Sequence, residues 1–500
     1  MIKRSAIIVH RWLGVALCLF FLVWFPSGIG MMYWDFPGVS AGDRLDRAAA
    51  LDPSTIHLSP AEASAVVGPS QPPAQVRLNT FDGRPVYRFG AGRGEILVYA
   101  DTGARQADVP SAMASRVASS WVRQPADAAI VDTLDHADQW TVQRSFRNEG
   151  LLSKFSWPNG EQVYVLRSSG EVVQYTTTAS RIGAYLGPIP HWIYFTPLRK
   201  NQPAWRRVVI WSSGIGTCAA ILGIVVGVWM YSPSKRYRLA GAPTSIPYRG
   251  QKRWHTVLGL IFGLGAVTWA FSGLLSMDPF PPGAETPMDI PHALRGRLEL
   301  AAYAARGPRE ALAQLPNLSV KELELTTFAG EPVYLATLGR GATRVVPLVG
   351  PTREEFSRQE IVSIVNQASQ PRGLAEARVI EQYDAYYLDR RRQRPLPVIL
   401  ARVKDAEHTR YYIDPRTARV VGSYSSRDWV SRWLYHGLHS LDVPWLYNYR
   451  PLWDIVVITF MLGGTALCVT SLILAWRVIG SYFFGGGVQR AGLSADPLSR

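Results

Sequence analysis

The sequence predicts a membrane protein. Four apolar helices form a transmembrane bundle, two long polar segments form α+β domains outside the membrane, and the whole is a tandem pseudo-twofold repeat. Three observations predict this fold. Four segments of the 500-residue chain are almost free of charge, and each reaches the ~20 residues that cross a hydrocarbon core. The segments between them are long and polar, and short motifs recur at a nearly constant offset. The apolar segments lie at roughly 12–34, 208–231, 256–277 and 453–476.

Lysine and arginine in the short connections predict the orientation of the helices. The segment 232–254 has six basic residues and no acidic one, and the N-terminus adds Lys3 and Arg4. We expect both in the cytoplasm, with the tail after Arg477, and the two long segments outside. The first apolar run continues past Cys18 without a small-residue cleavage site, which favours an uncleaved anchor. The predicted parts are helix 1 at 1–34, a first outer domain at 35–205, helix 2 at 206–232, a basic loop at 233–253, helix 3 at 254–277, a second outer domain at 278–451, helix 4 at 452–477 and a cytoplasmic tail at 478–500.

Charge and cysteine content exclude several classes of function. The net charge of +15 is partly a signal of membrane topology, and no compact basic domain predicts nucleic-acid binding. The three cysteines, Cys18, Cys218 and Cys468, all fall in predicted spans, so we expect no disulfides in the outer domains. No Cys-x-x-Cys-His motif occurs, which excludes covalent attachment of a c-type haem.

Two kinds of motif occur twice. "HRWLGVALCLFFLVWFPSG" at 10–28 and "HTVLGLIFGLGAVTWAFSG" at 255–273 share a histidine, a glycine, a tryptophan and a Ser-Gly pair at an offset of 245. Outside the spans, "TFDGRPVY" at 80–87 matches "TFAGEPVY" at 327–334 at an offset of 247. Each half therefore reads helix, outer domain, helix. Both halves start inside, so the repeat is parallel and its axis runs along the membrane normal.

The outer segments are predicted to be α+β. "EILVYADTGARQ" (95–106), "QVYVLRSSGEVVQY" (162–175) and "RYYIDPRTARVVGSY" (410–424) each read as strand, turn and strand. A helical stretch at 357–369 precedes strands. We expect two such small units in each outer segment.

These patterns resemble a known family. Strand–turn–strand units carried between apolar helices resemble PepSY domains, and "HRWLG" and "GLHSLDVPWLYNYRPLWD" (437–454) resemble the PepSY-associated transmembrane family. The resemblance implies a multi-pass protein of the bacterial inner membrane with two PepSY-like domains in the periplasm. Members of the family include reductases for ferric siderophores that carry b-type haem, while others have no settled role. Unlike some relatives, this chain has no fused flavodoxin-like domain.

His10 and His255 are candidate haem ligands near the inner edge of the membrane. Each lies 18 residues before the glycine of its Ser-Gly pair, or about 27 Å along a helix. As repeat equivalents they sit at equal depth across the axis, where two neutral imidazoles can ligate one haem iron. Gly14 and Gly259 leave room beside them for a flat macrocycle. The basic residues that can pair with propionates are Arg11 and Arg253. The alternative is a pair of interfacial histidines held by lipid headgroups.

His191 and His439 repeat this logic on the outer side, where they predict a second b-type haem. Each precedes a tryptophan, Trp205 or Trp453, by 14 residues, and the offset between them is 248. His436 breaks the symmetry. It can replace His439 as ligand, pair with His191, or hydrogen-bond a propionate. Since Pro188 stands at its repeat position, His439 is the symmetric choice. Two or three of these histidines with Asp442 can instead hold a metal ion. We expect the remaining histidines on the surface: His57, His136, His292 and His408.

Haem at both faces predicts transmembrane electron transfer. Electrons enter at the His10/His255 haem from a cytoplasmic donor or quinol, and leave at the outer haem for a periplasmic acceptor. The resemblance implies an oxidoreductase, a haem-dependent reductase of a ferric siderophore. The rival is a haem-free, membrane-anchored PepSY module that binds or regulates a partner. A transporter would need ionisable residues deep in the spans, and none occur. Membrane lipid is an expected partner and nucleic acid is not.

Overall fold

The computed structural model describes residues 1–68, 73, 75–91, 94–106, 108–143, 150–279 and 288–483. These residues form two compact units, each described by itself. The helical unit comprises the described residues of 1–36, 179–279 and 429–483, and the strand-rich unit comprises those of 37–178 and 288–428.

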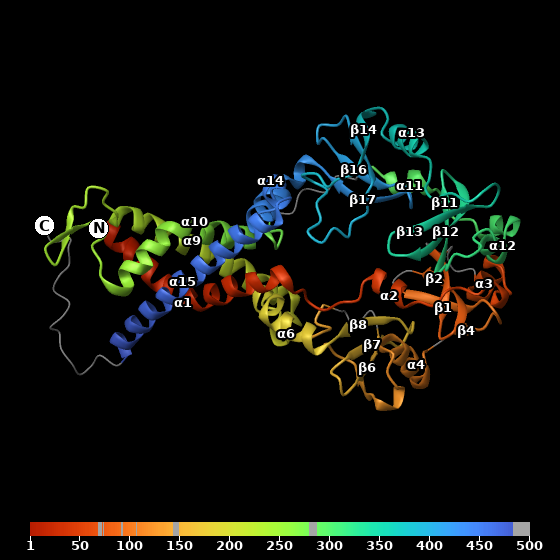
Figure 1. Ribbon diagram of the computed structural model, residues 1–500, viewed down its shortest axis with the longest axis horizontal. Coiled ribbons are helices and arrows are strands. Elements are labelled where there is room, and N and C mark those ends of the chain that lie inside the picture. Colours follow the sequence, from red (N-terminus) through yellow and green to blue (C-terminus); the bar gives the residue numbers. More distant parts are fainter. Residues whose placement is uncertain are drawn as a thin grey trace. The chain divides into compact units, whose positions relative to one another are not determined.

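Four long helices make up most of the helical unit (Figure 1). All four are long and apolar enough to cross a membrane. α1 packs against α9 and α15, and α10 packs against the same two helices, so α1 and α10 lie diagonally across the bundle. With the sheets of the other unit, these helices fit a membrane protein with α+β domains. The four are α1 (Ile2–Tyr33), α9 (Gln202–Met230), α10 (Gly250–Leu275) and α15 (Arg450–Phe483).

Three of the long helices begin before their predicted starts. α9 begins at Gln202 rather than 206, because Asn201 caps it by accepting a hydrogen bond from the Ala204 N–H. α10 begins at Gly250 rather than 254, and α15 runs over Arg450–Phe483 rather than 452–477. Charged side chains lower the hydropathy and so end a predicted apolar span. They do not interrupt the backbone hydrogen bonds, so the helix continues beyond that point. Of the predicted tail, 484–500 lies outside the described residues.

Two stretches assigned by sequence to the outer domains belong to the helical unit instead. Residues 179–201 and 429–449 form short helices there. One of them packs on α1, and a π-helix packs on α10. Because they are polar and aromatic rather than uniformly apolar, hydropathy assigns them to the wrong unit. They are α6 (Thr178–Leu186), α7 (Pro188–Trp192), α8 (Thr196–Arg199), the π-helix η5 (Val430–Gly437) and α14 (Pro444–Tyr447).

The strand-rich unit is built on one seven-stranded antiparallel sheet of order β13-β12-β11-β1-β2-β3-β4. Its strands come from both halves of the chain, so the two outer segments form one unit rather than two separate domains. β1 and β11 join them, with Val76 opposite Leu325 and Leu78 opposite Leu323, all buried. Burial of these four side chains explains the junction, since alone each strand would be an apolar edge. The strands are β1 (Gln75–Phe81), β2 (Arg84–Ala91), β3 (Gly94–Tyr99), β4 (Arg105–Gln106), β11 (Glu322–Phe328), β12 (Glu331–Gly339) and β13 (Ala342–Pro347).

Two four-stranded antiparallel sheets complete the unit, each covered by a helix. α4 packs on β6 and β7, and α13 packs on β14 and β15. The hairpins predicted at 162–175 and 410–424 and the helix predicted at 357–369 are confirmed as β7–β8, β16–β17 and α13. The strand, turn and strand predicted at 95–106 are also confirmed, as the paired strands β3 and β4 at the edge of the central sheet.

The strands and helices of these flanking parts are β5 (Ile130–Leu134), β6 (Leu152–Ser156), β7 (Gln162–Leu166), β8 (Val172–Thr176), β14 (Leu374–Ile380), β15 (Val398–Val403), β16 (Arg410–Asp414), β17 (Arg419–Tyr424), α4 (Ser111–Val122) and α13 (Arg358–Ala368). Smaller helices of the same unit are α2 (Ala41–Arg47), η1 (Pro53–Thr55), α3 (Pro60–Val67), η2 (Ala126–Ala128), α11 (Ile290–Arg295), η3 (Leu300–Ala305), α12 (Pro308–Ala313) and η4 (Ser426–Asp428).

Candidate functional site

The helical unit holds two pairs of histidines. His10 on α1 and His255 on α10 face each other across the bundle diagonal, with ring centroids 6.2 Å apart. His191 on α7 and His439, just after η5, form the second pair, with ring centroids 5.9 Å apart. The structure therefore brings together the residues that the sequence paired. In each pair, one imidazole comes from each half of the chain.

The Nδ1 atom of each imidazole has a partner on a neighbouring element. His10 Nδ1 lies 3.0 Å from the Ala219 carbonyl oxygen, and His191 Nδ1 lies 3.2 Å from that of Trp24. A carbonyl only accepts, so Nδ1 carries the proton in both rings and Nε2 keeps a lone pair. His255 Nδ1 lies 3.2 Å from the Thr470 hydroxyl oxygen. Such partners fix the orientation of metal-binding histidines.

The repeated Ser-Gly pairs support the outer histidines. Ser27 Oγ lies 3.2 Å from His191 Nδ1, and Ser272 Oγ lies 2.9 Å from His439 Nδ1. Both hydroxyls donate to the carbonyl three residues earlier, which leaves their oxygens free to accept from the imidazole. A Cβ at the adjacent Gly28 would lie 3.0 Å from Met461 Cε, so the glycine lets Met461 pack closely here. Sequence alone gave these serines no role, because their partners are more than 160 residues away.

The 14-residue spacing between histidine and tryptophan also has a structural reason. Trp205 Nε1 donates to the Trp192 carbonyl at 2.8 Å, and Trp453 Nε1 donates to the Ser440 carbonyl at 2.9 Å. In both places the acceptor belongs to the residue that directly follows the paired histidine. Each indole thus ties the first turns of a long helix to the short segment that carries a histidine.

Both pairs have the separation that a shared metal ion requires. A metal–nitrogen bond of about 2 Å and about 1.1 Å from nitrogen to ring centre give centroids about 6 Å apart. The observed separations are 6.2 and 5.9 Å. Beside the inner pair, a Cβ at Gly14 would lie 3.8 Å from Ser471 Oγ, and one at Gly259 would lie 3.8 Å from Leu467 Cδ1, which are ordinary van der Waals contacts. Each pair of imidazoles could therefore hold one haem, whose iron would supply one-electron redox chemistry.

Other metal arrangements lack ligands within the described ranges. There, no three His, Cys, Asp or Glu side chains converge on a point that could hold an ion. A structural zinc ion takes four protein ligands, and a catalytic one takes three. The Asp442 alternative raised by the sequence therefore has no support among the described residues.

A cavity of about 90 Å³, partly open, adjoins the outer pair. This volume is smaller than that of a typical cofactor pocket. His191, His439 and Tyr435 form part of its wall. Six of the other fourteen lining residues are aromatic: Phe21, Trp24, Phe25, Trp192, Trp205 and Trp269. Aromatic rings of this kind suit contact with a flat apolar group.

His436 differs from His439 in its surroundings. Its side chain is exposed, and its ring lies 4.5 Å from the ring of Tyr435. His439 is the one that lines the cavity and faces His191. The four histidines expected on the surface are exposed in the strand-rich unit: His57, His136, His292 and His408.

Burial keeps the outer imidazoles neutral. It lowers the pKa of His191 to about 4 and the pKa of His439 to about 3; for His439, the neighbouring His191 and His436 lower it further. Both rings are therefore uncharged near pH 7, which is the form that binds a metal.

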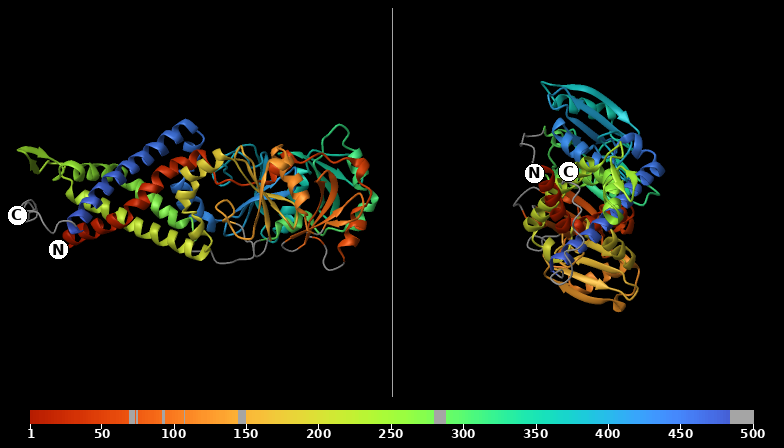
Figure 2. Two further views of the ribbon diagram at one scale, coloured as in Figure 1. Left: turned by 90° about the horizontal axis from the view of Figure 1, so that it is seen from below. Right: turned by 90° about the vertical axis from the view of Figure 1, so that its left-hand side faces the viewer.

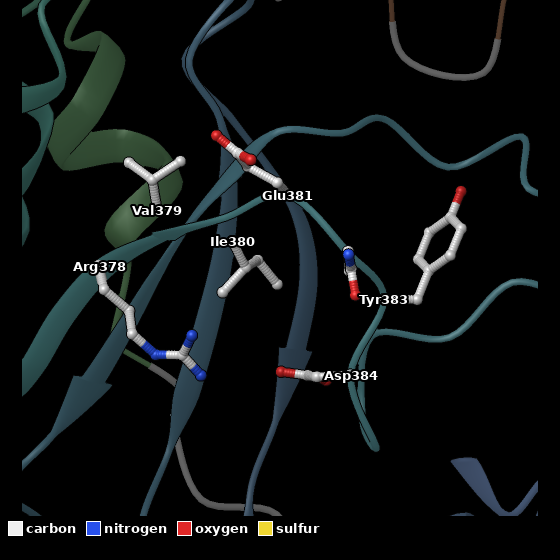
Figure 3. Close-up of a pocket in the computed structure, with 7 residues that line it drawn as sticks. Arg378, Val379, Ile380, Glu381, Tyr383 and Asp384 are labelled. Atoms are coloured by element: carbon white, nitrogen blue, oxygen red, sulfur yellow. The ribbon is translucent and has the colours of Figure 1, made fainter. Parts of the chain in front are cut away.

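A second hollow lies in the strand-rich unit, at the end of β14 (Figure 3). A single stretch, 378–384, lines it. Two of its three charged side chains have partners: Arg378 Nε pairs with Glu376 at 2.7 Å, and Asp384 accepts from the Tyr412 hydroxyl at 2.9 Å. This hollow carries no arrangement of groups suited to catalysis.

Comparison with known proteins identifies the family to which the chain belongs. No curated protein matches it. The model of the PepSY-associated TM region matches residues 7–343, about two thirds of the chain. The matched stretch includes His10, His191 and His255, and His439 lies beyond its end. The chain belongs to the PepSY-associated transmembrane family.

Proposed function

We propose that this protein carries electrons across the bacterial inner membrane through two non-covalent b-type haems. His10 and His255 would ligate one iron, and His191 and His439 the other. One observation carries the proposal: two imidazole pairs in the same bundle each have the separation that a bridging metal needs. Bound haem would supply reversible one-electron reduction at each pair.

The distance between the pairs supports two sites rather than one. His10 and Ser27, which contacts His191, are 17 residues apart on α1, or about 25 Å along the helix. His255 and Ser272, which contacts His439, have the same spacing on α10. A single site cannot serve both faces of a ~30 Å core. Two sites in line divide the crossing into shorter steps.

The chain's own residues have distinct roles at these sites. Ser27 and Ser272 hold the outer imidazoles through Nδ1, which leaves the lone pair on Nε2. Arg199 packs over the Trp205 ring at 4.6 Å, and its Nε is buried without a hydrogen-bond partner, which suits it to a haem propionate. Arg11 is the matching candidate at the inner pair. Further basic residues would make the outer entrance positive: Lys200, Arg206, Arg207, Arg432 and Arg450.

The direction of transfer follows from topology. Lysine and arginine place the 232–254 segment in the cytoplasm under the positive-inside rule, so electrons would enter at His10/His255 from a cytoplasmic donor or quinol. They would leave at His191/His439 for a periplasmic acceptor, and we propose a ferric siderophore. Its iron is released on reduction, because Fe(II) binds hard oxygen ligands less strongly than Fe(III). The protein would then be a ferric-siderophore reductase.

The test is the haem content of the purified full-length protein and of single variants. We expect two haems per chain, with Soret and α bands that shift on reduction by dithionite. His10→Ala and His255→Ala should each remove one and the same haem, and His191→Ala and His439→Ala the other. His436→Ala is the matched control and should keep both.

Full haem content in all four variants would refute the ligand assignment. A protein that purifies without haem, and takes none up when reconstituted, would instead favour a membrane-anchored module that binds or regulates a partner. Loss of haem in His436→Ala but not in His439→Ala would show only that the outer ligand is His436.

A further inference from the structure

The segment between α9 and α10 folds into a β-hairpin. β9 (Tyr237–Leu239) and β10 (Ala242–Thr244) pair antiparallel. Ala240 and Gly241 connect them with φ of 52° and 82°, as a two-residue type I′ turn requires. The hairpin extends past the ends of the long helices, at the end of the unit where the N-terminus lies (Figures 1 and 2).

Hydrogen bonds fix this hairpin to the helix that carries His255. At its base, the Ser232 N–H donates to the Ser245 carbonyl at 2.9 Å. Arg253 Nη1 donates to Thr244 Oγ1 at 3.0 Å. Arg253 lies two residues before His255, about 3 Å along the axis of α10. The hairpin is thus tied to the helical turn that bears one of the inner imidazoles.

Among the described residues, charge at this end of the unit has one sign. Residues 1–34, 202–275 and 455–483 contain no aspartate or glutamate. Arg236 and Arg238 are exposed on the hairpin, and Arg236 is oriented by its neighbour, since it donates to the Tyr237 hydroxyl at 2.7 Å. Membrane topology requires only the number of basic residues. It does not require that they be presented on a folded and anchored hairpin, which therefore needs another explanation.

We propose that this hairpin, with the basic helix ends beside it, docks a small soluble electron-carrier protein that has an acidic surface. The inference deepens the proposed function, on which it rests, by naming the class of donor. Complementary charge would steer the carrier to the end of the bundle that holds His10 and His255. One electron would leave the carrier's reduced iron–sulfur cluster and enter the inner site. No bond forms or breaks, and no proton needs to move.

The experiment uses the full-length protein in nanodiscs of neutral phosphatidylcholine, with a reduced acidic [2Fe–2S] ferredoxin as probe. Binding is measured by interferometry and the rate of reduction by stopped flow, at about 20 mM and about 0.5 M salt, where screening differs strongly. Arg236→Gln/Arg238→Gln should weaken binding and slow reduction about tenfold at low salt, and less than about twofold at high salt. Arg105→Gln/Arg123→Gln removes the same charge from exposed positions of the strand-rich unit and should change neither.

A second variant tests whether ferredoxin binding requires the folded hairpin or only its positive charge. Gly241→Val keeps every charge but places a β-branched residue at φ 82°, which the turn does not accommodate. It should weaken ferredoxin binding as well. Variants that bind ferredoxin like the unchanged protein at low salt would overturn the proposal. So would variants that differ only in nanodiscs containing anionic phosphatidylglycerol, because lipid would then be the occupant.

Dithionite distinguishes this proposal from the one on which it rests. This small reductant needs no docking surface, so it should reduce the variants as fast as the unchanged protein. If dithionite reduces nothing, the proposed electron transfer fails, while ferredoxin binding still decides whether the hairpin docks an acidic protein.

Discussion

At the scale of single residues, the paired histidines depend on groups that sequence patterns do not connect with them. His191 and His439 each take a serine from the far end of a different helix, Ser27 on α1 and Ser272 on α10. The serine accepts from Nδ1 because its own proton is used within its helix. This arrangement leaves the lone pair of the imidazole on Nε2. A motif of two common residues, Ser-Gly, thereby sets the tautomer of an imidazole.

Replacing these serines tests that role. We expect Ser272→Ala to weaken haem retention at the outer site about 10- to 100-fold, the usual effect of losing a partner of a metal-binding histidine. Haem at the inner site should be unchanged. Ser212→Ala on α9 is the control, since its hydroxyl bonds only within its own helix. The measurement is transfer of haem to apomyoglobin over time; equal rates for Ser272→Ala and Ser212→Ala would remove the serine from the site.

A glycine provides a second test, at the inner pair. A Cβ on Gly223 would lie 2.7 Å from His10 Cε1, closer than side chains approach one another. We therefore expect Gly223→Ala to displace the His10 ring and to lower haem content at the inner site, with the outer haem retained. Gly214→Ala on the same helix meets nothing within 4 Å and should keep both haems. Selective loss of the outer haem would contradict the assignment of His10 to the inner site.

At the scale of elements, two indoles join the long helices to the short segments that carry the outer histidines. Trp205 at the start of α9 bonds to the carbonyl of Trp192, and Trp453 at the start of α15 bonds to that of Ser440. After η5, this second bond acts together with those that Ser272 and Trp269 make to His439. On each side, one directional hydrogen bond therefore helps to fix the position of the histidine-bearing segment relative to the long helix.

Trp453→Phe removes this bond and keeps an aromatic ring. Trp453 is 1% exposed, so the unpaired Ser440 carbonyl and the lost volume should together cost about 1–3 kcal/mol. We expect a lower melting temperature in detergent and preferential loss of the outer haem. Trp476→Phe on the same helix is the control, since Trp476 is 74% exposed. If both variants melt alike, the indole bond does not support the outer site.

The sequence predicted those helices and hairpins that can be recognised from their own residues, through hydropathy, alternation or turn motifs. The four apolar helices, the hairpins at 162–175 and 410–424 and the helix at 357–369 belong to this group. The histidine pairs were predicted from constant offsets, and the structure brings their rings together. The junction of β1 with β11 was missed, because the residues of neither strand indicate that it pairs with a strand more than 240 residues away. The boundary of the helical unit was missed for a related reason, since α7 and η5 are recognised only by what they pack on.

At the scale of the whole molecule, each unit is built from both halves of the chain. In the strand-rich unit, β1 and β11 pair so that Val76 faces Leu325 and Leu78 faces Leu323, symmetrically about Arg77 and Glu324. In the helical unit, each histidine pair takes one ring from the first half and one from the second. The tandem repeat predicted from the sequence would account for both facts, since two equivalent halves would meet about a common axis.

This construction leads to a prediction about the divided chain. If the protein is expressed as two pieces, 1–240 and 241–500, neither piece holds both rings of a pair. We expect each piece alone to bind no haem with two axial histidines, and the pieces expressed together to copurify through a tag on one of them, with both haems restored. The β1–β11 junction and the contacts among α1, α9, α10 and α15 supply the interface. Leu323→Asp in the second piece would bury a charge at that junction and should reduce copurification, whereas Glu331→Gln, at an exposed position of β12, should not. Two-haem spectra from either piece alone would mean that ligands within one half suffice, and the shared sites proposed here would have to be abandoned.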